Sequence, residues 1–511
     1  MTAKTLMIMG THSNAGKSIL VTALCRIFAQ EGYRVAPFKA QNMALNAGVT
    51  LEGHEIGRAT IAQAEAAGLA AHVDMNPVLL KPEGNRRSQV VLNGRHHTHI
   101  EADNWLSLKS MLWPHVAAAL ERLRARTDLV IIEGAGSPAE INLKEGDIVN
   151  MRVARHAQSP TLLVGDIDRG GVFAALVGTM MLLEPEERAL VKGFIINKFR
   201  GDVSLLGDGL AMLQARAFNT PTLGVIPFLP EIGVAAEDSV ALEEGRQSRG
   251  AREQGSGGEA KIIDIAVIRL PCISNFDDFD PLAAEPGVRV RFVERVGDLG
   301  QPAAVILPGS KMTLADLAWL RQTGLADRVT ALAEVGTPTV GICGGYQMLG
   351  RSLFDPDGVE AETGMEAAGL NLLPVETIFA GDKRTVQVQA TLQAKSGPFA
   401  ALQGMPIGGY EIHMGRSHPI NSDPASLCHI GPPGHGHADG ALAANGRIWG
   451  TYLHGLFDND ALRQAWLSSL GWQGSSQPFD RQLAYNRLAA HVRAHVDMAT
   501  LRRIIWGKEE G

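Results

Sequence analysis

The stretch GTHSNAGKS, residues 10–18, has the composition of a phosphate-binding loop. The usual pattern has four residues between the first glycine and Gly-Lys-Ser/Thr, whereas five residues separate Gly10 from Gly16. An apolar run precedes the loop and an amphipathic segment follows it, so backbone N–H groups at a helix N-terminus would face phosphate oxygens. In that geometry Lys17 reaches the β- and γ-phosphates and Ser18 binds Mg²⁺. An ordinary glycine-rich turn is the alternative interpretation.

Other residues that could serve this nucleotide site follow later apolar runs. Glu133 ends the run LVIIE, where a second Mg²⁺ ligand would lie at the C-terminal edge of a parallel sheet. Lys39 follows RVAPF and either neutralises phosphate charge in the transition state or is a surface lysine. Thr11 and Asn14 of the loop are included among the predicted ATP-binding residues.

Two further turns offer candidates of lower specificity. Asn197, in INKFRGD, lies in a turn resembling the base-reading Asn-Lys turns of nucleotide-binding domains, so we expect it to contact adenine. The segment DIDRGGVFA places Asp166, Asp168 and Arg169 directly after another apolar run. These three side chains either contact a metal or a substrate carboxylate, or they are structural.

A second stretch, GICGGYQMLG at residues 341–350, could provide a nucleophile. A nucleophile elbow needs small residues two positions before and after the reactive side chain, and Gly341 and Gly345 flank Cys343 in this way. A helix N-terminus beside the cysteine favours the thiolate. The alternative is a small cysteine buried in a glycine-rich turn.

A thiolate nucleophile needs an acid/base partner, usually histidine. Among the 16 histidines, His454 in GTYLHGLFD is the best candidate, because it follows an apolar run late in the chain. Backbone N–H groups near Gly309 and at Gly344 could form an oxyanion hole.

Both stretches require parallel strands that end at one edge of a sheet. Apolar runs separated by helical segments such as 19–33 predict such strands. The runs of the first half lack period-2 alternation, as strands buried on both faces should. The expected strands are 5–9, 34–38, 128–134, 161–167, 193–197 and 222–228, and then 262–270, 288–296, 304–309, 337–343, 386–392 and 449–457. The predicted fold class is therefore α/β, with two doubly wound α/β domains and a helical C-terminal tail.

Composition excludes several classes of function. The 511 residues carry a net charge of −7, with 45% hydrophobic and 20% charged residues. This gives no basic face for nucleic acid or a membrane, and no apolar stretch approaches the roughly 20 residues of a spanning helix. Four widely separated cysteines argue against disulfides or a zinc site and favour a cytoplasmic protein. The oligomeric state is not predicted.

We interpret NGRHHTHI, residues 93–100, as a polar loop and not as a metal site.

The motifs also resemble known families. The spacing of the glycine loop resembles that of the dethiobiotin synthetase-like family, which implies that ATP activates a carboxylate. The pattern Gly-x-Cys-x-Gly-x-Gln together with His454 resembles a class I glutamine amidotransferase. That resemblance implies that Cys343 attacks glutamine and releases ammonia, that His454 transfers the proton and that Gln347 helps to hold glutamine.

The resemblance has one departure. The usual family has Glu two residues after the histidine, where this chain has Leu456. The third member of the triad is therefore missing or comes from elsewhere, such as Asp458 or Glu411. The cobalamin-pathway branch of the superfamily shows such a reduced arrangement.

Over about residues 3–460 the chain closely resembles the cobyric acid synthase family. The motifs that carry this resemblance are GTHSNAGKS, PFKAQNMALN, EGAGSPAEINL, DIDRGGVFA, INKFRGD, LPCISNFDDFDPL, LPGSKMT, GICGGYQMLG and GYEIHMGRS. Family membership implies a corrinoid substrate, adenosylcobyrinic acid a,c-diamide. It also implies four amidations, at the b, d, e and g carboxylates, each with glutamine and ATP and with Mg²⁺.

These inferences predict four regions and leave three alternatives. The regions are an ATP-binding amidoligase domain at 1–242, a linker at 243–261, a glutamine amidotransferase domain at 262–460 and a helical extension at 461–511. The alternatives are cobyrinic acid a,c-diamide synthase, a non-enzymatic P-loop switch of the partitioning type, and a plain glutaminase or hydrolase.

Overall fold

The computed structural model describes residues 2–83, 87–101, 105–230, 233–234, 262–420, 425–432, 435–474 and 478–507. The expected linker, 243–261, lies outside the described residues. The chain divides into two compact units. The first unit comprises residues 1–44, 56–235 and 480–511, and the second comprises 45–55 and 236–479.

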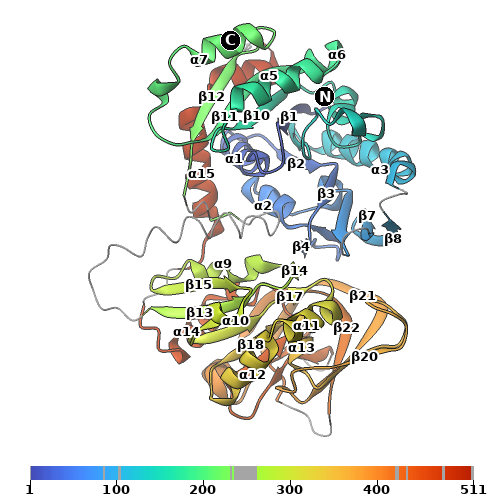
Figure 1. Cartoon of the computed structure of the whole chain (residues 1–511), viewed down its shortest axis with the longest axis vertical. Coiled ribbons are helices and arrows are strands. Elements are labelled where there is room, and N and C mark those ends of the chain that lie inside the picture. The colour runs from blue at the N-terminus through green and yellow to red at the C-terminus, as the bar shows by residue number, and fades with distance from the viewer. Residues whose placement is uncertain are drawn as a thin grey trace. The chain divides into compact units, whose positions relative to one another are not determined.

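The first unit contains a six-stranded parallel sheet with the strand order β12-β11-β10-β1-β9-β2. Its strands are β1 (Lys4–Gly10), β2 (Val35–Lys39), β9 (Leu129–Glu133), β10 (Thr161–Asp166), β11 (Val191–Phe199) and β12 (Thr222–Pro227). The core strands are buried almost throughout, because helices cover both faces of the sheet (Figure 1). All six predicted strands of the first half are thus present, and the parallel α/β fold is confirmed.

Helices of the first unit form two apolar clusters, one on each face of the sheet. The helices are α1 (Lys17–Gln30), α2 (Arg58–Ala66), α3 (Trp105–Arg126), α4 (Met151–Ala157), α5 (Val172–Leu182), α6 (Pro185–Arg188), α7 (Gly209–Arg216), α15 (Arg481–His495) and α16 (Met498–Trp506). Helix α15 returns from near the C-terminus to pack on α1, where Leu488, Ala489 and Val492 share a buried cluster with Leu24. The sequence predicts a single helical extension over 461–511, whereas α15 and α16 share the buried core of the first unit.

A smaller four-stranded sheet in the first unit was not anticipated. It has the order β3-β6-β7-β8, with β3 (Gln41–Met43), β6 (Val78–Pro82), β7 (Arg87–Leu92) and β8 (Arg95–Glu101). The histidines of 93–100 lie on β8, so the prediction of a polar loop was wrong. The physical reason is the Asn93-Gly94 turn, in which both residues have positive φ, 48° and 77°. This dipeptide favours the tight turn of a β-hairpin.

The second unit contains another six-stranded sheet, ordered β15-β13-β16-β18-β26-β25. Its parallel strands are β13 (Ile263–Ile268), β15 (Val288–Val293), β16 (Ala304–Leu307), β18 (Thr339–Ile342) and β26 (Ile448–Thr451), and the short β25 (Ala441–Leu442) is antiparallel. Its helices are α9 (Asp280–Ala283), α10 (Val296–Leu299), α11 (Thr313–Gln322), α12 (Leu325–Glu334), α13 (Gly344–Leu349) and α14 (Asp460–Ser469). This sheet confirms a second α/β domain.

An additional mixed sheet lies in the same unit. It is built from β19 (Ser352–Asp355), β20 (Met365–Ala368), β21 (Val375–Leu392), β22 (Pro406–Pro419), β23 (Cys428–Ile430) and β24 (His437–Asp439). The predicted strand 386–392 belongs to β21, which pairs antiparallel with β22 and is not a strand of the doubly wound sheet. The alternation of VQVQATL is that of a strand with one exposed face.

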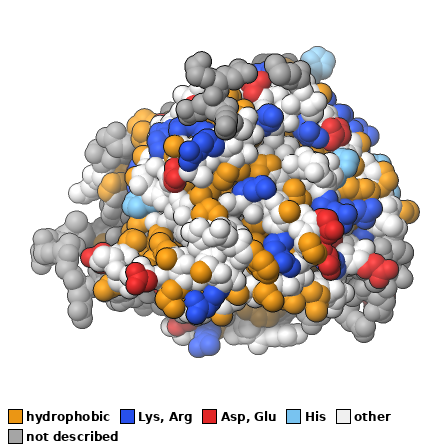
Figure 2. Space-filling view, turned by 90° about the horizontal axis from the view of Figure 1, so that it is seen from above, with side chains coloured by type: hydrophobic (Ala, Val, Ile, Leu, Met, Phe, Trp, Pro, Cys, Tyr) orange, Lys and Arg blue, Asp and Glu red, His pale blue; other side chains and the backbone are white. Residues whose placement is uncertain are grey.

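The described surface mixes charge types. On the face shown in Figure 2, basic and acidic side chains are interspersed among apolar ones. Within the part of the chain that the structure describes, none of the helices is both long enough and apolar enough to cross a bilayer.

Candidate active sites

The glycine loop connects β1 to α1 at the C-terminal edge of the first unit's parallel sheet. Gly16 has a φ of 99°, and a Cβ there would lie 2.0 Å from the Asn197 side-chain nitrogen. Asn197 donates a hydrogen bond to the backbone oxygen of Ala15 at 2.9 Å. The loop therefore requires glycine at this position for two reasons, backbone conformation and close approach. The expected contact of Asn197 with adenine stays a prediction.

Two side chains of the loop region suit an anionic ligand. Lys17 is only 7% exposed, and its Nζ donates to the carbonyl oxygens of His12 and Gly136 at 3.1 and 3.3 Å. The hydroxyl of Thr11 is buried and has no hydrogen-bond partner among the described residues. A buried cation and an unsatisfied hydroxyl beside a helix N-terminus fit the phosphate groups of a nucleotide.

Glu133, at the end of β9, is the centre of a buried polar cluster. Its Oε1 accepts hydrogen bonds from Ser18 Oγ at 2.8 Å and from Lys39 Nζ at 2.7 Å. Its Oε2 accepts one from Gln63 Nε2 at 2.5 Å. The hydroxyl and carboxylate oxygens are ligand types that Mg²⁺ prefers, so Ser18 and Glu133 fit the predicted metal pair.

Burial distinguishes the two interpretations of Lys39. Its side chain is 4% exposed and forms an ion pair with a fully buried Glu133, so it is not a surface lysine. Gln63, on α2, is a member of this cluster that the sequence analysis missed. Nothing in its local sequence marks it, because α2 approaches the loop only in the folded chain.

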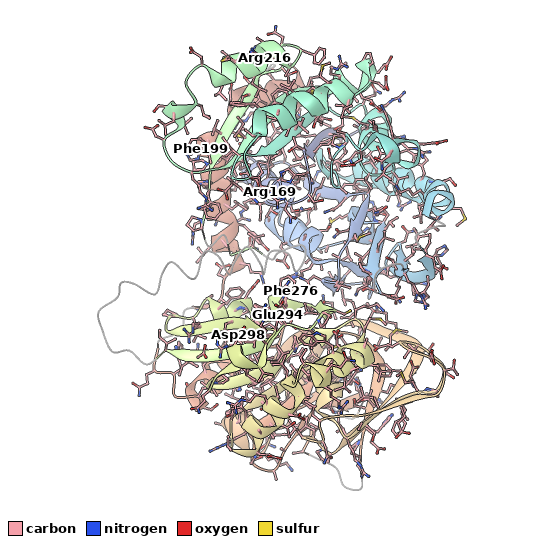
Figure 3. All side chains as sticks on the ribbon, in the orientation of Figure 1. Arg169, Phe199, Arg216, Phe276, Glu294 and Asp298 are labelled. Atoms are coloured by element: carbon pink, nitrogen blue, oxygen red, sulfur yellow. The ribbon has the colours of Figure 1, made fainter. Side chains whose placement is uncertain are left out.

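The residues after β10 are divided between the interior and the surface. Asp166 is buried and pairs with Lys198 at 3.1 Å, with Arg169 Nε 3.9 Å away. Asp168 is half exposed and pairs with Arg200 at 2.9 Å. Figure 3 labels Arg169, whose side chain is about half exposed.

Within the described ranges, no group of three or more His, Cys, Asp or Glu side chains is arranged to hold a metal ion. A substrate contact by Asp166, Asp168 and Arg169 remains a proposal.

In the second unit, Cys343 lies on the sharp turn between β18 and α13. Its φ and ψ are 50° and −109°, a strained conformation for a residue other than glycine. A Cβ at Gly345 would lie 1.9 Å from the Leu307 carbonyl oxygen, and one at Gly341 would lie 2.6 Å from the Tyr346 nitrogen. A larger side chain would clash at either position, so both positions require glycine, as a nucleophile elbow does.

His454 lies just beyond β26 and is 1% exposed. Its Nδ1 is 2.7 Å from Asp278 Oδ2, and the other carboxylate oxygen accepts from the Gly455 N–H at 2.8 Å. Burial by itself lowers the pKa of His454, but the charge and hydrogen bond of Asp278, with hydrogen bonding to Cys343, outweigh burial and raise this pKa to about 10. The arrangement stabilises an imidazolium beside the cysteine.

Asp278 therefore occupies the place of the third triad member. Leu456, at the usual position of that residue, is buried in the apolar core, and Asp458 is exposed. Asp278 belongs to the motif LPCISNFDDFDPL, in which no carboxylate was predicted to have a catalytic role. It lies 176 residues before His454, so only the fold brings the two together.

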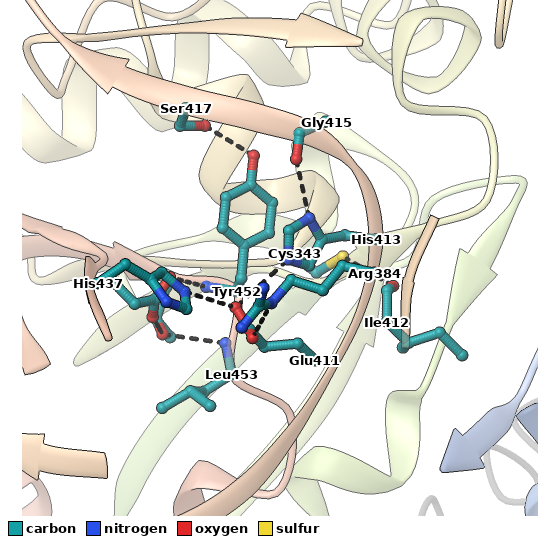
Figure 4. A network of polar contacts seen from close by, with 12 residues as sticks. Cys343, Arg384, Glu411, Ile412, His413, Gly415, Ser417, His437, Tyr452 and Leu453 are labelled. Atoms are coloured by element: carbon teal, nitrogen blue, oxygen red, sulfur yellow. Dashed lines mark hydrogen bonds and ion pairs between the residues drawn. The ribbon is translucent and has the colours of Figure 1, made fainter. Parts of the chain in front are cut away.

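Glu411, the other carboxylate considered for the third position, pairs with side chains that do not include His454. It forms ion pairs with Arg384, with His413 at 3.4 Å and with His437 at 3.5 Å (Figure 4). Burial raises the pKa of Glu411, but hydrogen bonds from His413 and Arg384 outweigh burial and lower it to about 2. This network lies close to Cys343, since the backbone oxygen of neighbouring Ile412 is 3.8 Å from Cys343 Sγ.

The remaining predicted residues surround Cys343 and His454. A Cβ at Gly309 would lie 3.3 Å from His454 Cε1, and one at Gly344 would lie 2.9 Å from the backbone nitrogen of Ser310. Gln347 is buried; it accepts from Thr313 Oγ1 at 3.0 Å and donates to the Tyr452 hydroxyl at 3.2 Å. The roles of Gly309 and Gly344 in an oxyanion hole and of Gln347 in glutamine binding stay predictions.

Two family models match the chain. Residues 6–241 match the CobQ/CobB/MinD/ParA nucleotide binding domain. Residues 264–462 match the CobB/CobQ-like glutamine amidotransferase domain. The two matches cover both of the sites described above.

Curated relatives match the chain along nearly its whole length. A cobyric acid synthase of Chloroflexus aurantiacus is 52% identical over 507 residues, covering 99% of this chain and 100% of the relative. A cobyric acid synthase of Dehalococcoides mccartyi is 50% identical over 509 residues, covering 98% of each chain. One of Chloroflexus aggregans is 51% identical over 506 residues, covering 99% of each.

Proposed function

Because this chain belongs to the cobyric acid synthase family, we propose that its two sites carry out the two halves of one amidation reaction. The chain is an ATP- and glutamine-dependent carbon–nitrogen ligase of cobalamin biosynthesis. We assign ammonia release to the second unit and carboxylate activation to the first. The substrate is adenosylcobyrinic acid a,c-diamide, amidated at its b, d, e and g carboxylates.

In the second unit, Cys343 attacks the side-chain amide of glutamine. The raised pKa of His454 keeps a proton on the imidazole, and this proton goes to the departing ammonia. Asp278 holds the imidazole in one orientation and stabilises its positive charge. Water then hydrolyses the glutamyl thioester, and backbone N–H groups of Gly309 and Gly344 stabilise the oxyanion of each tetrahedral intermediate.

In the first unit, the glycine loop binds the phosphates of ATP. Bound ATP with Mg²⁺ supplies the phosphoryl group that converts a substrate carboxylate into an acyl phosphate. Ser18 and Glu133 would hold the Mg²⁺, and Lys17 and Lys39 neutralise charge on the phosphates. Ammonia attacks the acyl carbon, and phosphate leaves. We place the reaction in the cytoplasm, which the four free cysteines support.

One observation carries the proposal: a cysteine on a strained elbow next to a buried histidine–carboxylate pair. The rival activity, cobyrinic acid a,c-diamide synthase, uses the same kinds of domain. The near full-length similarity to cobyric acid synthases favours the first. A partitioning switch has no use for the Cys343 arrangement, and a plain glutaminase has no use for the Glu133 cluster.

Replacing Cys343 with alanine tests the proposal. ATP-dependent amidation of the corrin diamide is measured with glutamine and, separately, with ammonium. We expect the variant to lose the glutamine-dependent reaction and to retain the ammonium-dependent one. Wild-type rates with glutamine would show that Cys343 is not the nucleophile. Amidation of cobyrinic acid at a and c by the wild-type protein, with no reaction of the a,c-diamide, would support the rival.

A further inference from the structure

A short segment of the N-terminal region, residues 45–55, belongs to the second unit, although the chain on either side of it belongs to the first. We call it the inserted segment. Much of it is buried: Ala47 is fully buried, Asn46 is 1% exposed, and Val49 and Thr50 are each 2% exposed. A turn between Thr50 and His54 closes it, with the His54 carbonyl oxygen accepting from the Thr50 N–H at 2.8 Å. The hydrogen bonds described next join these buried residues to the second unit.

Asn275 is the main anchor of the inserted segment. Its backbone N–H donates to Asn46 Oδ1 at 2.7 Å, and its side chain exchanges two hydrogen bonds with the backbone of Ala47, at 2.9 and 3.3 Å. Asn275 is 2% exposed and has a φ of 54°, a conformation that asparagine tolerates better than most residues. Its side chain thus pairs with the segment as a neighbouring strand would.

The segment has a second anchor on β21. Gln387 Nε2 donates to the Val49 carbonyl oxygen at 2.5 Å, and Lys383 forms an ion pair with the buried Glu55. These contacts fix the far end of the inserted segment independently of Asn275.

Asn275 also contacts one of the two groups that hold the catalytic imidazole. Its side-chain nitrogen donates to the Tyr410 hydroxyl at 2.9 Å. The Tyr410 ring stacks on His454, with centroids 5.2 Å apart and planes inclined by 20°. The two residues also exchange backbone hydrogen bonds, at 2.9 and 3.2 Å. Tyr410 thereby fixes one face of the imidazole.

The other group is Asp278, three residues after Asn275. Its backbone N–H donates to the Asn275 carbonyl oxygen at 3.1 Å, and its carboxylate binds His454 Nδ1. A displacement of Asn275 would therefore disturb both the stacking partner and the hydrogen-bond partner of His454.

We propose that Asn275 and Tyr410 are positioning residues for glutamine hydrolysis, through which the inserted segment fixes the orientation of the His454 imidazole. The proposal rests on the proposed function, because it assigns His454 to proton transfer. It names residues that act through His454 and do not touch glutamine. The inserted segment is thus a component of the glutaminase site supplied by the N-terminal part of the chain.

The test compares Tyr410→Phe and Asn275→Ala with the wild type in the full chain. Tyr410→Phe keeps the stacked ring and removes the hydroxyl, which accepts from Asn275 and donates to the Ala47 carbonyl oxygen at 3.5 Å. We expect kcat for glutamine hydrolysis to fall about 5-fold with KM unchanged. Asn275→Ala loses both the Tyr410 bond and the anchor of the segment, and kcat falls about 10- to 50-fold. Ammonium-dependent amidation stays at the wild-type rate in both variants.

The pH profile separates positioning from a general loss of structure. The titratable groups that face His454, among the described residues, are Asp278, Cys343 and Tyr410. A looser Asp278 contact lowers the pKa of His454, so the basic limb of kcat/KM moves to lower pH in Asn275→Ala. A purely structural defect would reduce the amount of active protein without moving this limb.

Tyr485→Phe is the matched control. It removes a buried tyrosine hydroxyl bond, to Glu65 at 2.7 Å, in the first unit, and glutamine hydrolysis stays unchanged. Wild-type kcat and pH profiles in both Tyr410→Phe and Asn275→Ala would overturn the proposal, and so would parallel losses with glutamine and ammonium. Persistent hydrolysis in Cys343→Ala would instead refute the proposed function.

Discussion

Each of the two candidate sites contains a buried carboxylate paired with a basic side chain, Asp278 with His454 and Glu133 with Lys39. The two pairs differ in whether the carboxylate is already in the contact that the proposed reaction needs. In the second unit, Asp278 binds Nδ1 of the His454 imidazole, and the same imidazole is hydrogen-bonded to Cys343. In the first unit, the Glu133 carboxylate, which would hold Mg²⁺, already accepts hydrogen bonds from Lys39 and Ser18 at Oε1 and from Gln63 at Oε2.

This difference concerns preorganisation. The groups proposed for glutamine hydrolysis already contact one another in the fold, an arrangement that would minimise reorganisation in the transition state. The Glu133 cluster neutralises itself, so a cation must compete with Lys39 for the carboxylate. We therefore expect substitutions in the first unit to affect stability as well as catalysis, and those in the second to affect mainly rate.

The largest expected effect is the loss of amidation with both nitrogen sources when the glycine loop is altered. Lys17→Ala removes the cation expected to face the phosphates. Amidation with either glutamine or ammonium should fall about 10³- to 10⁵-fold, the range for a cation that stabilises charge on a transferred phosphoryl group. Glutamine hydrolysis without the corrin acceptor serves as the internal control and should persist. Unchanged amidation would remove the loop from the reaction.

The next effect tests the self-neutralised cluster. Lys39→Met leaves Glu133 buried without its cationic partner, and the free energy of unfolding measured with urea should fall by about 3 kcal/mol. The double variant Lys39→Met/Glu133→Gln removes both charges and should recover most of this loss. If the single and double variants are equally destabilised, lost packing and not charge explains the effect.

A third substitution tests the prearranged pair. Asp278→Asn keeps the shape but removes the charge, and kcat for glutamine hydrolysis should fall about 10²-fold, within the range of general acid–base catalysis. Because Asp278 raises the pKa of His454 to about 10, the wild-type imidazolium persists into the basic range. In the variant it loses its proton at lower pH, so the basic limb of kcat/KM moves down. A limb that stays in place would separate Asp278 from the proton transfer.

The smallest effect is expected at a carboxylate proposed from sequence alone. Asp458 is exposed, and the carboxylate bound to His454 is Asp278. Asp458→Asn should change kcat by less than about 2-fold, as for ordinary surface substitutions, and leave the pH profile in place. A loss as large as that of Asp278→Asn would reverse the assignment of the third member.

Local patterns predicted the parts of the molecule that local sequence determines. The strands of the first sheet are visible as apolar runs because they are buried on both faces. The elbow around Cys343 is visible because a close approach such as that of Gly345 to Leu307 admits only glycine. The histidines of β8 were misassigned because polar residues on an exposed strand resemble a loop when the Asn-Gly turn before them is overlooked.

The parts that sequence could not predict depend on contacts distant along the chain. Asp278 meets His454 across 176 residues, and Gln63 reaches Glu133 across 70. Gln63 lies in no motif, and although Asp278 lies in LPCISNFDDFDPL, nothing local tells which of the carboxylates in that motif meets a histidine. The membership of residues 45–55 in the second unit is likewise a property of the tertiary structure alone.

Helix α15 has a consequence for how the protein is made. Its residues Leu488, Ala489 and Val492 complete the apolar cluster around α1, so the ribosome must synthesise the chain past these residues before the first unit has its full core. At roughly 5–20 residues per second, the early strands wait tens of seconds for their last helix. The second unit needs residues 45–55, which emerge long before the rest of it. The two units therefore cannot mature strictly one after the other, and a cut at a single point in the gene would not yield two self-sufficient folding modules.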